Sequence, residues 1–406
     1  MSQYQTVTID ELQTGMFVEA VAKQTGNLKI KSQGKVSSEN VIEWLRRQGI
    51  LELVVDVSKG AEETSSKPAN DEANSTNKAT SGDKNSPKKF VDLQLEIRRA
   101  TELHKNAQNI QKRLFIAAQK GIKFNLNATQ KVADAVVESL NRNPNALLCM
   151  TQIRAKGGYL FEHSVNCGVL MAAFAKSMGF DDKLVWDLTF SGLVHDLGMV
   201  KVPSRILNKD GKLDAAEQKV VREHVRNSIA LLKPFKEVSE TVFRTIRCHH
   251  ERLDGTGYPL GLDGDNINQY SRMLAIVDTY DAMIAERSYK KPILAANALK
   301  LLLKYSETQF DRDLVCKFIK CVGVYPIGSL VKLKSEKVGV VVDLNEAKPF
   351  KPKINVFYST RSNHFLPKRD IDLATGHSAE EILEPTSAKV NRINYKRFFM
   401  EQMQVA

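Results

Sequence analysis

The feature that most constrains this chain is a segment that cannot form a core. Residues 61–89, AEETSSKPANDEANSTNKATSGDKNSPKK, contain no Val, Ile, Leu, Met or aromatic residue. Such a composition is typical of a disordered linker, because too little apolar surface is available to offset the entropy of ordering. The 406-residue chain is therefore expected to fold as separate bodies on the two sides of this segment.

The part before the linker, residues 1–60, predicts a small α+β module. Short apolar runs, GMFVEAV and LELVVDVS, flank one amphipathic stretch, SSENVIEWLRRQGI. Ser37 or Ser38 is placed to cap a helix there, and Gly49 to end it. Because every candidate metal ligand lies beyond residue 160, we expect this module to be regulatory rather than catalytic.

Residues 90–322 have a helical pattern throughout. Apolar residues recur at three- and four-residue spacing in successive segments, of which the first is either one long helix or two. Asp181 and Asp182 sit where an N-cap belongs, and Gly179 and Gly198 sit where helices end. We therefore predict an all-α domain of seven or more helices with short connections.

The character changes after Pro326. SLVKLKSEKVGVVVDLN and INVFYST predict a small sheet, and a basic tail, NRINYKRFFMEQ, closes the sequence with a helical pattern. The predicted fold class is mainly α, with a small N-terminal α+β module and a small C-terminal β subdomain. The expected boundaries are 1–60 for the module, 61–89 for the linker, 90–138 for connecting helices, 139–325 for the catalytic bundle, 326–376 for the β subdomain and 377–406 for the tail.

The net charge of +12 indicates an anionic partner. Basic residues are spread along the sequence without an aromatic-interleaved basic block, so nucleic acid is not expected. The N-terminus lacks the pattern of a secretory signal, and no run approaches the roughly 18 apolar residues of a membrane span. Five cysteines without a CxxC pair favour reduced thiols and a cytoplasmic location.

Five of the eight histidines lie between residues 163 and 250, in the same part of the helical region as two aspartates. Burying so many polar groups without partners would cost several kcal/mol, so we expect them to converge on one point, as helix-borne metal ligands do. His104, His364 and His377 lie outside this pattern and are interpreted as structural or solvated. The candidate ligands are His163, His195, Asp196, His224, His249, His250 and Asp278.

The number and type of these residues indicate the metal. Seven imidazole and carboxylate groups are too many for one tetrahedral zinc, and the absence of nearby cysteine argues against a thiolate site. They suit two six-coordinate ions, Fe or Mn, bridged by a carboxylate and a water, which can clamp a phosphate diester and generate the attacking hydroxide. The neighbours His249 and His250 are expected to reach opposite sides of such a centre.

The order and spacing of these residues resemble the motifs of a known family. His195 and Asp196, preceded by His163 and followed by Asp278, resemble the H…HD…D framework of the HD metal-dependent phosphohydrolase superfamily. HHERLDGTGYP, DTYDAMIAERSYKKPI and QFDRDLV resemble its HD-GYP branch, whose members hydrolyse cyclic di-GMP and related cyclic dinucleotides. The similarity covers about residues 140–325, and the preceding region resembles the N-terminal module of some bacterial HD-GYP proteins.

The resemblance also implies roles for individual residues. Asp196 would bridge the two ions, and His224, His249 and His250 would complete the second ion. Arg287 and Lys290 would grip substrate phosphate through charge-assisted hydrogen bonds. Gly255, Gly257 and Tyr258 would form a substrate-binding loop, in which the glycines allow close approach to a ligand and the tyrosine stacks on a base or bonds to phosphate.

Two positions depart from the family pattern. Met199 stands where a lysine is common, three residues after the Asp of the HD pair, and Lys201 lies two residues further on. Tyr159 stands where some members have a glutamate that helps hold a third ion, and Glu162 would point elsewhere on a helix. The chain is therefore expected to hold two ions, and Met199 is expected to slow its turnover.

The resulting hypothesis is a metal-dependent phosphodiesterase that converts cyclic di-GMP or mixed cyclic GMP-AMP to the linear dinucleotide. The alternative is a catalytically weak signalling module that binds a cyclic dinucleotide or a diguanylate cyclase domain. An HD nucleotidase acting on mononucleotides is disfavoured by the HHE…GYP motif. The sequence is compatible with a homodimer.

Overall fold

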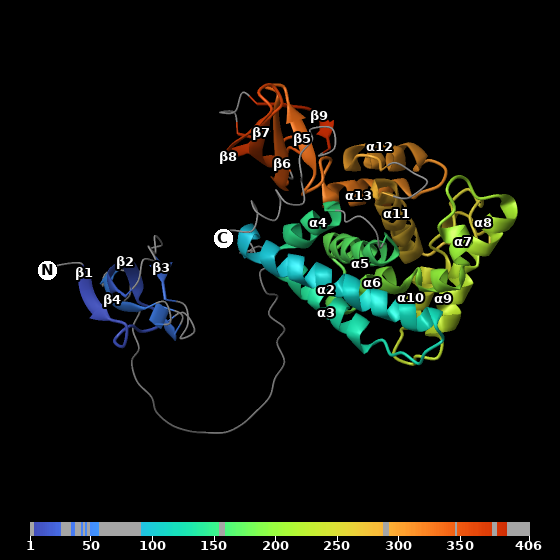
Figure 1. Ribbon diagram of the computed structural model, residues 1–406, viewed down its shortest axis with the longest axis horizontal. Helices are drawn as coiled ribbons and strands as arrows, with labels where there is room; N and C mark the ends of the chain where they lie inside the picture. The colour runs from blue at the N-terminus through green and yellow to red at the C-terminus, as the bar shows by residue number, and fades with distance from the viewer. Residues whose placement is uncertain are drawn as a thin grey trace, which may run out of the picture. The chain divides into compact units, whose positions relative to one another are not determined.

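The structure is a computed structural model in which the chain divides into two compact units, Met1–Ser86 and Pro87–Ala406. We describe each unit by itself (Figure 1). The predicted linker and the helical segment 391–402 of the predicted tail lie outside the described residues. The predicted boundary at residue 377 is wrong, because Ile382–Thr386, placed in the tail, form a strand of the C-terminal sheet. The residues described are 4–25, 34–36, 42–43, 45–46, 49–56, 91–153, 159–286, 292–345, 347–375 and 380–387.

The N-terminal unit is built on a four-stranded sheet with strand order β1-β4-β2-β3. Both β1 and β2 pair antiparallel with β4. Apolar side chains of the sheet and of the short helical stretch around residue 45 form its core, which includes Val7, Val18, Leu45 and Leu53. The expected α+β character is therefore present. Its strands are β1 (Tyr4–Thr8), β2 (Phe17–Gln24), β3 (Gly34–Lys35) and β4 (Ile50–Asp56).

The second unit begins with a helical body. The first predicted helical segment forms a single long helix, α2, which crosses the front of this body in Figure 1. The helices are α2 (Leu93–Gln119), α3 (Asn127–Arg142), α4 (Pro144–Gln152), α5 (Tyr159–Ser177), α6 (Asp182–Val194), α7 (Ser204–Leu207), α8 (Ala215–Arg222), α9 (His224–Leu232), α10 (Glu240–Arg247), α11 (Gln269–Ile284), α12 (Ala295–Tyr305) and α13 (Arg312–Val322), with 3-10 turns η2 (Leu197–Lys201) and η3 (Gly264–Asn266).

The helices α5 and α6 form the centre of this body, and their long apolar runs are buried over most of their length. Glycine lets the two helices approach closely. A Cβ built at Gly192 would lie 2.7 Å from the backbone carbonyl carbon of Cys167 on α5, and real Cβ contacts are essentially never that short. Because metal-ligand candidates lie at the ends of both helices, this close packing fixes one part of the site to another.

Local sequence accounts for several helix ends. Asp181 caps α6 by accepting a hydrogen bond from the amide of Leu184 at 2.8 Å, as the sequence predicts. Gly179 has φ of +76° at the end of α5, a conformation that favours glycine. Gly198 does not end a helix but lies inside η2, where a Cβ would come within 2.0 Å of the carbonyl oxygen of His224. It is therefore required for close approach rather than for termination.

A five-stranded antiparallel sheet follows the helices, with strand order β8-β7-β6-β5-β9. It packs beside α4, and Asn145 of α4 donates a hydrogen bond to the Asp343 carboxylate at 2.9 Å. Its inner residues belong to the same apolar core as the helices. The mainly α class with two small sheets is thus confirmed. The strands are β5 (Leu330–Leu333), β6 (Lys337–Asp343), β7 (Lys353–Ser359), β8 (His364–Asp372) and β9 (Ile382–Thr386).

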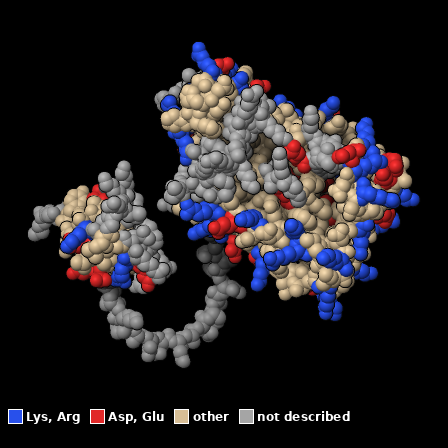
Figure 2. Space-filling model, viewed as in Figure 1, with Lys and Arg blue, Asp and Glu red and all other residues tan. Residues whose placement is uncertain are grey.

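The surface agrees with the charge pattern of the sequence. Figure 2 shows Lys and Arg side chains scattered over the face in view, with Asp and Glu among them. No helix within the described ranges is both long enough and apolar enough to cross a membrane.

Candidate metal centre

All seven candidate metal ligands lie in the second unit, at or near the ends of helices or on an inner helix face. His163 is on the first turn of α5, His195 directly follows α6, and Asp196 directly precedes η2. His224 is the first residue of α9. The remaining three are His249 and His250, just after α10, and Asp278 in the middle of α11.

The fold brings these seven residues together in two adjacent groups of possible ligands. The first group is His163, Cys167, His195 and Asp278, and the second group is Asp196, His224, His249 and His250. Within each group, one ligand atom from every residue lies within 4.8 Å of the others. Ligand atoms that share one ion at about 2.1 Å and at right angles lie about 3 Å apart, so each group is close to the spacing that binding requires.

Asp196 faces both groups. Its Oδ2 lies 3.8 Å from Nε2 of His163 and 3.7 Å from Nε2 of His195, both in the first group. Its Oδ1 lies 3.3 Å from Nε2 of His224 in the second group. The two oxygens of one carboxylate are therefore presented to two different sets of imidazoles, which is the geometry that a bridging ligand needs.

Three of the histidines are oriented by a backbone carbonyl near the end of the helix that precedes them. Nδ1 of His195 donates to the carbonyl of Gly192 at 2.8 Å, and His224 and His249 donate to carbonyls three residues earlier at 2.7 Å. Each bond fixes the tautomer that leaves Nε2 as a lone-pair donor. Nε2 of His195 and of His249 is buried and has no hydrogen-bond partner within the described part of the chain. A metal ion would satisfy both atoms, so the residues fit such a group.

His163 is oriented in a different way. Its Nδ1 lies 2.8 Å from Oδ2 of Asp281, and its Nε2 lies 3.1 Å from Oδ1 of Asp278. Burial by itself would lower the pKa of His163, but the electrostatic interaction with Cys167 and the hydrogen bonds to these two carboxylates hold the pKa well above its usual value. A proton between two buried carboxylates occupies the place where positive charge is favoured, and a metal cation meets the same field.

Burial and neighbouring charges also shift the pKa values of His249, Asp196 and Asp278. Burial, together with the charges of His195 and His224, lowers the pKa of His249 to about 3, so this imidazole is neutral at physiological pH. Burial would raise the pKa of Asp196, but the neighbouring histidines lower it. Asp278 is likewise held well below its usual pKa, against burial, by His163 and His250. The neutral imidazole of His249 and the ionised carboxylates of Asp196 and Asp278 are the forms that bind metal.

Two residues near the centre were not predicted. Asp281 is buried and holds His163; its spacing of three from Asp278 on α11 could have indicated it, since both lie on one helix face. The sulfur of Cys167 lies 3.7 Å from Nδ1 and 3.8 Å from Nε2 of His163. The expectation that no cysteine is nearby was therefore wrong, because Cys167 follows His163 by one helical turn and shares its buried face.

The adjacent histidines do not reach opposite sides of the centre as predicted. Both His249 and His250 belong to the second group, with ring centroids 4.0 Å apart and planes at 39°. His249 is fully buried against His195, whereas His250 stacks on the ring of Tyr258 at 4.6 Å. One histidine of the pair therefore lies in the buried part of the centre, and the other contacts the loop that follows α10.

That loop is organised by Glu251, a residue the sequence reasoning did not single out. Its buried carboxylate accepts hydrogen bonds from the amides of Leu260 at 2.7 Å and Leu262 at 3.0 Å. A Cβ at Gly257 would lie 2.4 Å from Cα of Glu251, and Gly255 has φ of +74°. Both glycines are therefore required by the conformation of the loop itself, apart from any contact with a ligand.

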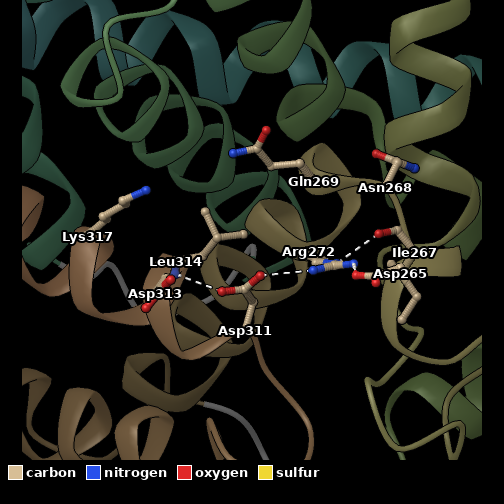
Figure 3. Close-up of a pocket in the computed structure, with 9 residues that line it drawn as sticks. All are labelled: Asp265, Ile267, Asn268, Gln269, Arg272, Asp311, Asp313, Leu314 and Lys317. Carbon is tan, nitrogen blue, oxygen red and sulfur yellow. Dashed lines mark hydrogen bonds and ion pairs between the residues drawn. The ribbon is translucent and has the colours of Figure 1, made fainter.

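The end of the same loop is tied to α13 by Arg272 (Figure 3). Its guanidinium donates to the carbonyls of Ile267 and Gly264, both at 2.8 Å, and to the Asp311 carboxylate at 3.0 Å. These groups border a pocket of about 390 Å³ that contains none of the candidate ligands. The charges of Arg272 and Asp311 at this pocket are therefore accounted for by loop anchoring.

Hydrogen bonds also hold the turn that carries Asp196 against α9. The Ser228 hydroxyl donates to the carbonyl of His195 at 2.6 Å and accepts from the amide of Gly198 at 2.7 Å. Because Gly198 also lies against the carbonyl of His224, the turn carrying Asp196 is held against the start of α9 on both sides. This contact sets the spacing between Asp196 and His224.

The remaining predicted residues are placed as follows. Tyr159 stacks on His163 with ring centroids 5.2 Å apart, Met199 is half-buried in η2, and Lys201 is exposed. Arg287 and Lys290 lie outside the described residues. Among the histidines set aside, His104 is buried with Nε2 2.8 Å from Oδ1 of Asn166, as expected of a structural residue, and His364 is exposed; His377 also lies outside the described residues.

Comparison with known proteins agrees with this geometry. A family model for the HD domain matches residues 139–314, which contain every candidate ligand. A second model, for a domain of unknown function (DUF3391), matches residues 4–129. This second match covers the N-terminal module and extends through α2 into α3.

Three curated relatives are similar in sequence. The cyclic di-GMP phosphodiesterase PA4108 of Pseudomonas aeruginosa is 33% identical over 386 residues, which cover 94% of this chain and 92% of that protein. PdeB of Borreliella burgdorferi, a cyclic di-GMP phosphodiesterase, is 28% identical over 50% of this chain and 53% of its own length. The 3'3'-cGAMP-specific phosphodiesterase 3 of Vibrio cholerae is 34% identical over 43% and 38%, respectively. With a relative aligned along nearly its whole length and the HD domain matched over the metal centre, this chain belongs to the HD-GYP family of HD-domain phosphodiesterases.

Proposed function

We propose that this chain is a metal-dependent phosphodiesterase that hydrolyses cyclic di-GMP or a related cyclic dinucleotide, such as 3',3'-cyclic GMP-AMP, to the linear dinucleotide. The observation that carries the proposal is the convergence of seven ligand candidates in two adjacent groups. The buried Nε2 atoms of His195 and His249 have no hydrogen-bond partner among the described residues. The names of the relatives support the substrate class.

We assign the metal ligands as predicted, with His163, His195 and Asp278 on one ion, His224, His249 and His250 on the other, and Asp196 between them. Two divalent ions in such a pair of sites supply Lewis-acid activation of a phosphate diester and lower the pKa of water. The mixed nitrogen and oxygen donor set suits Fe or Mn. Cys167 is a neighbour of His163 rather than an assigned ligand.

The protein's own groups have distinct roles in this proposal. Asp196 holds the two groups at a fixed separation, and Asp281 orients His163 so that Nε2 faces the centre. Arg287 and Lys290 are proposed to neutralise charge that develops on the phosphate, a contribution worth about 100- to 1000-fold for one well-placed donor. Tyr258 stands at the side of His250 and borders the substrate.

The test is product analysis. Protein loaded with Fe or with Mn is incubated with cyclic di-GMP and with 3',3'-cyclic GMP-AMP, and the products are separated by chromatography. We expect the linear dinucleotide to appear first, and His249→Ala to abolish its formation while His364→Ala, a change at an exposed histidine of β8, does not. Fully metal-loaded protein that converts neither substrate would contradict the proposal.

One observation favours a second candidate function. Met199 offers no hydrogen-bond donor where the family commonly has a lysine, so turnover is expected to be slow. The second candidate is a signalling module that binds a cyclic dinucleotide, or a diguanylate cyclase domain, without appreciable hydrolysis. Tight binding of the cyclic dinucleotide with no product would select this candidate over the enzyme.

A further inference from the structure

The candidate metal ligands differ in their exposure to solvent. The side chains of His163 and His195 are 1% and 0% exposed, whereas those of Asp196 and Asp278 are each 12% exposed and that of His250 is 16% exposed. His249 is fully buried. A ligand therefore reaches the centre from the side of His250, Asp196 and Asp278, and residues beside His250 form the rim of this opening.

Tyr258 and Arg222 continue from His250 at this rim. The ring of Tyr258 stacks on His250 with centroids 4.6 Å apart and planes at 27°. The guanidinium carbon of Arg222 lies 5.0 Å from the centroid of the Tyr258 ring, within the range of a cation–π contact. Arg222 ends α8, two residues before His224, and its side chain is exposed. The contact with Tyr258 holds a cation beside the second group.

Among the described residues, the charge of Arg222 has no anionic partner. Within the described ranges no carboxylate oxygen lies within 4.0 Å of its side-chain nitrogens, whereas Arg226, four residues further, forms an ion pair with Glu223 at 3.6 Å. Arg272 and Arg142 are also paired with carboxylates. An exposed guanidinium that is positioned by an aromatic ring but has no anionic partner is suited to an anionic ligand.

We propose that Arg222 is a substrate-binding residue that holds the second phosphate of a cyclic dinucleotide. The inference rests on the proposed function. A cyclic dinucleotide carries two phosphodiester groups, and only one can lie between the two ligand groups while it is cleaved. The other must lie outside them, toward the open side, where Arg222 offers two parallel N–H donors to its oxygens.

The same arrangement gives Tyr258 a definite task. Its ring is stacked on His250 and in contact with Arg222, so it acts as a platform that limits the motion of the guanidinium rather than as a free surface for a base. Pre-ordering of this kind reduces the entropy lost when a long side chain binds phosphate. Arg222 also provides positive charge at a centre that has Met199 in place of a lysine.

The test compares substrates with two phosphates and with one. Steady-state kinetics are measured for wild type, Arg222→Gln, Arg222→Lys and the control Arg226→Gln, using cyclic di-GMP, 3',3'-cyclic GMP-AMP and bis(p-nitrophenyl) phosphate. We expect Arg222→Gln to raise KM for both cyclic dinucleotides about ten-fold or more, the effect of losing one charge-assisted pair. The loss in kcat/KM on the single diester should be several times smaller. Arg222→Lys should recover part of the affinity, and Arg226→Gln should resemble wild type.

A second measurement does not depend on turnover. Calorimetric titration of chelator-treated protein with cyclic di-GMP should show weaker binding for Arg222→Gln than for Arg226→Gln. If wild type hydrolyses or binds cyclic dinucleotides and Arg222→Gln matches it, or loses equally on all three substrates, the role of Arg222 is refuted and the proposed function stands. If wild type neither hydrolyses nor binds them, the proposed function fails and the role of Arg222 fails with it.

Discussion

The two groups of the metal centre are held in place by different means. In the second group, His224 and His249 are oriented by carbonyls three residues earlier in the chain. In the first group, His195 follows the same rule, but His163 depends on Asp281, 118 residues away on another helix. A local hydrogen bond forms whenever its helix end forms, whereas the bond to Asp281 requires α5 and α11 to be packed together.

This difference shows which parts of the centre are sensitive to distant change. The second group is braced by the contact of Gly198 with Ser228 on α9, so its geometry is set by neighbouring elements. The first group is set by tertiary packing and by a buried carboxylate that does not face the opening. A substitution of a residue that orients a ligand is therefore expected to change the metal affinity of one group only. A substitution of Asp196 is expected to change the metal affinity of both groups.

The largest expected effect is at Asp196, which faces both groups. Asp196→Ala should reduce the metal content of both groups and abolish hydrolysis, a loss greater than the about 10- to 100-fold typical of residues that only orient a ligand. Elemental analysis and product chromatography measure the two effects, with Asp210→Ala, at an exposed aspartate of the same unit, as the control. Full metal content in an inactive Asp196→Ala protein would exclude the bridging role, and a wild-type content near one ion per chain would exclude a two-ion centre.

The next effect is a gain. Met199 lies in η2, three residues after Asp196, and supplies no donor. A lysine there would add positive charge where negative charge develops on the phosphate, so Met199→Lys should raise kcat by up to about 100-fold, with less change in KM. Single-turnover rates decide the matter. A variant that keeps its metal but reacts at the wild-type rate or more slowly would show that other residues already supply this charge.

A smaller effect is expected at Asp281 and should be confined to the first group. Asp281→Asn keeps the size of the side chain but removes its negative charge, so metal affinity in the first group should fall by about 10- to 100-fold. Competition with a chelator, followed through both binding phases, distinguishes the groups, and Asp265→Asn provides a control at an exposed carboxylate. Equal weakening of both phases would show that the groups are not independently held.

The smallest effect concerns the N-terminal unit. No described residue of that unit belongs to either ligand group, and a protein that begins near Asn85 retains the helices α2 to α13. We expect it to fold, to bind metal in both groups and to hydrolyse substrate at the wild-type rate, because the module is proposed to be regulatory. A folded, metal-loaded but inactive protein would assign the module a direct part in the reaction.

Much of the centre could be predicted because its residues stand in recognisable motifs. The helical pattern predicted the elements that carry His163, His195 and Asp278, and the Asp181 cap formed as expected. The class of fold followed from periodicity, which reports burial on one face of a helix. These features depend on residues that are close in sequence, and such features are the ones a sequence displays.

The contacts between distant segments could not be predicted in the same way. The bond between Asp281 and His163 and the contact of Arg222 with Tyr258 are made by tertiary packing. The grouping of His249 with His250 on one side depends on how the chain turns after α10, because helical geometry no longer applies beyond its end. Cys167 shows a different limit, since it follows His163 by one helical turn in the sequence and yet no cysteine was expected near the ligands.

The core shared by the helices and the C-terminal sheet determines where the molecule can be divided. Ile327, Leu330 and Val331 pack in the same apolar core as the helices, and a Cβ at Gly328 would lie 3.0 Å from Cα of Cys149 on α4. Cutting the chain after α13 would therefore uncover apolar surface on the helices. A portable catalytic cassette, for grafting onto another sensor, has to extend through β9 to Thr386, well past the last residue that the HD model matches.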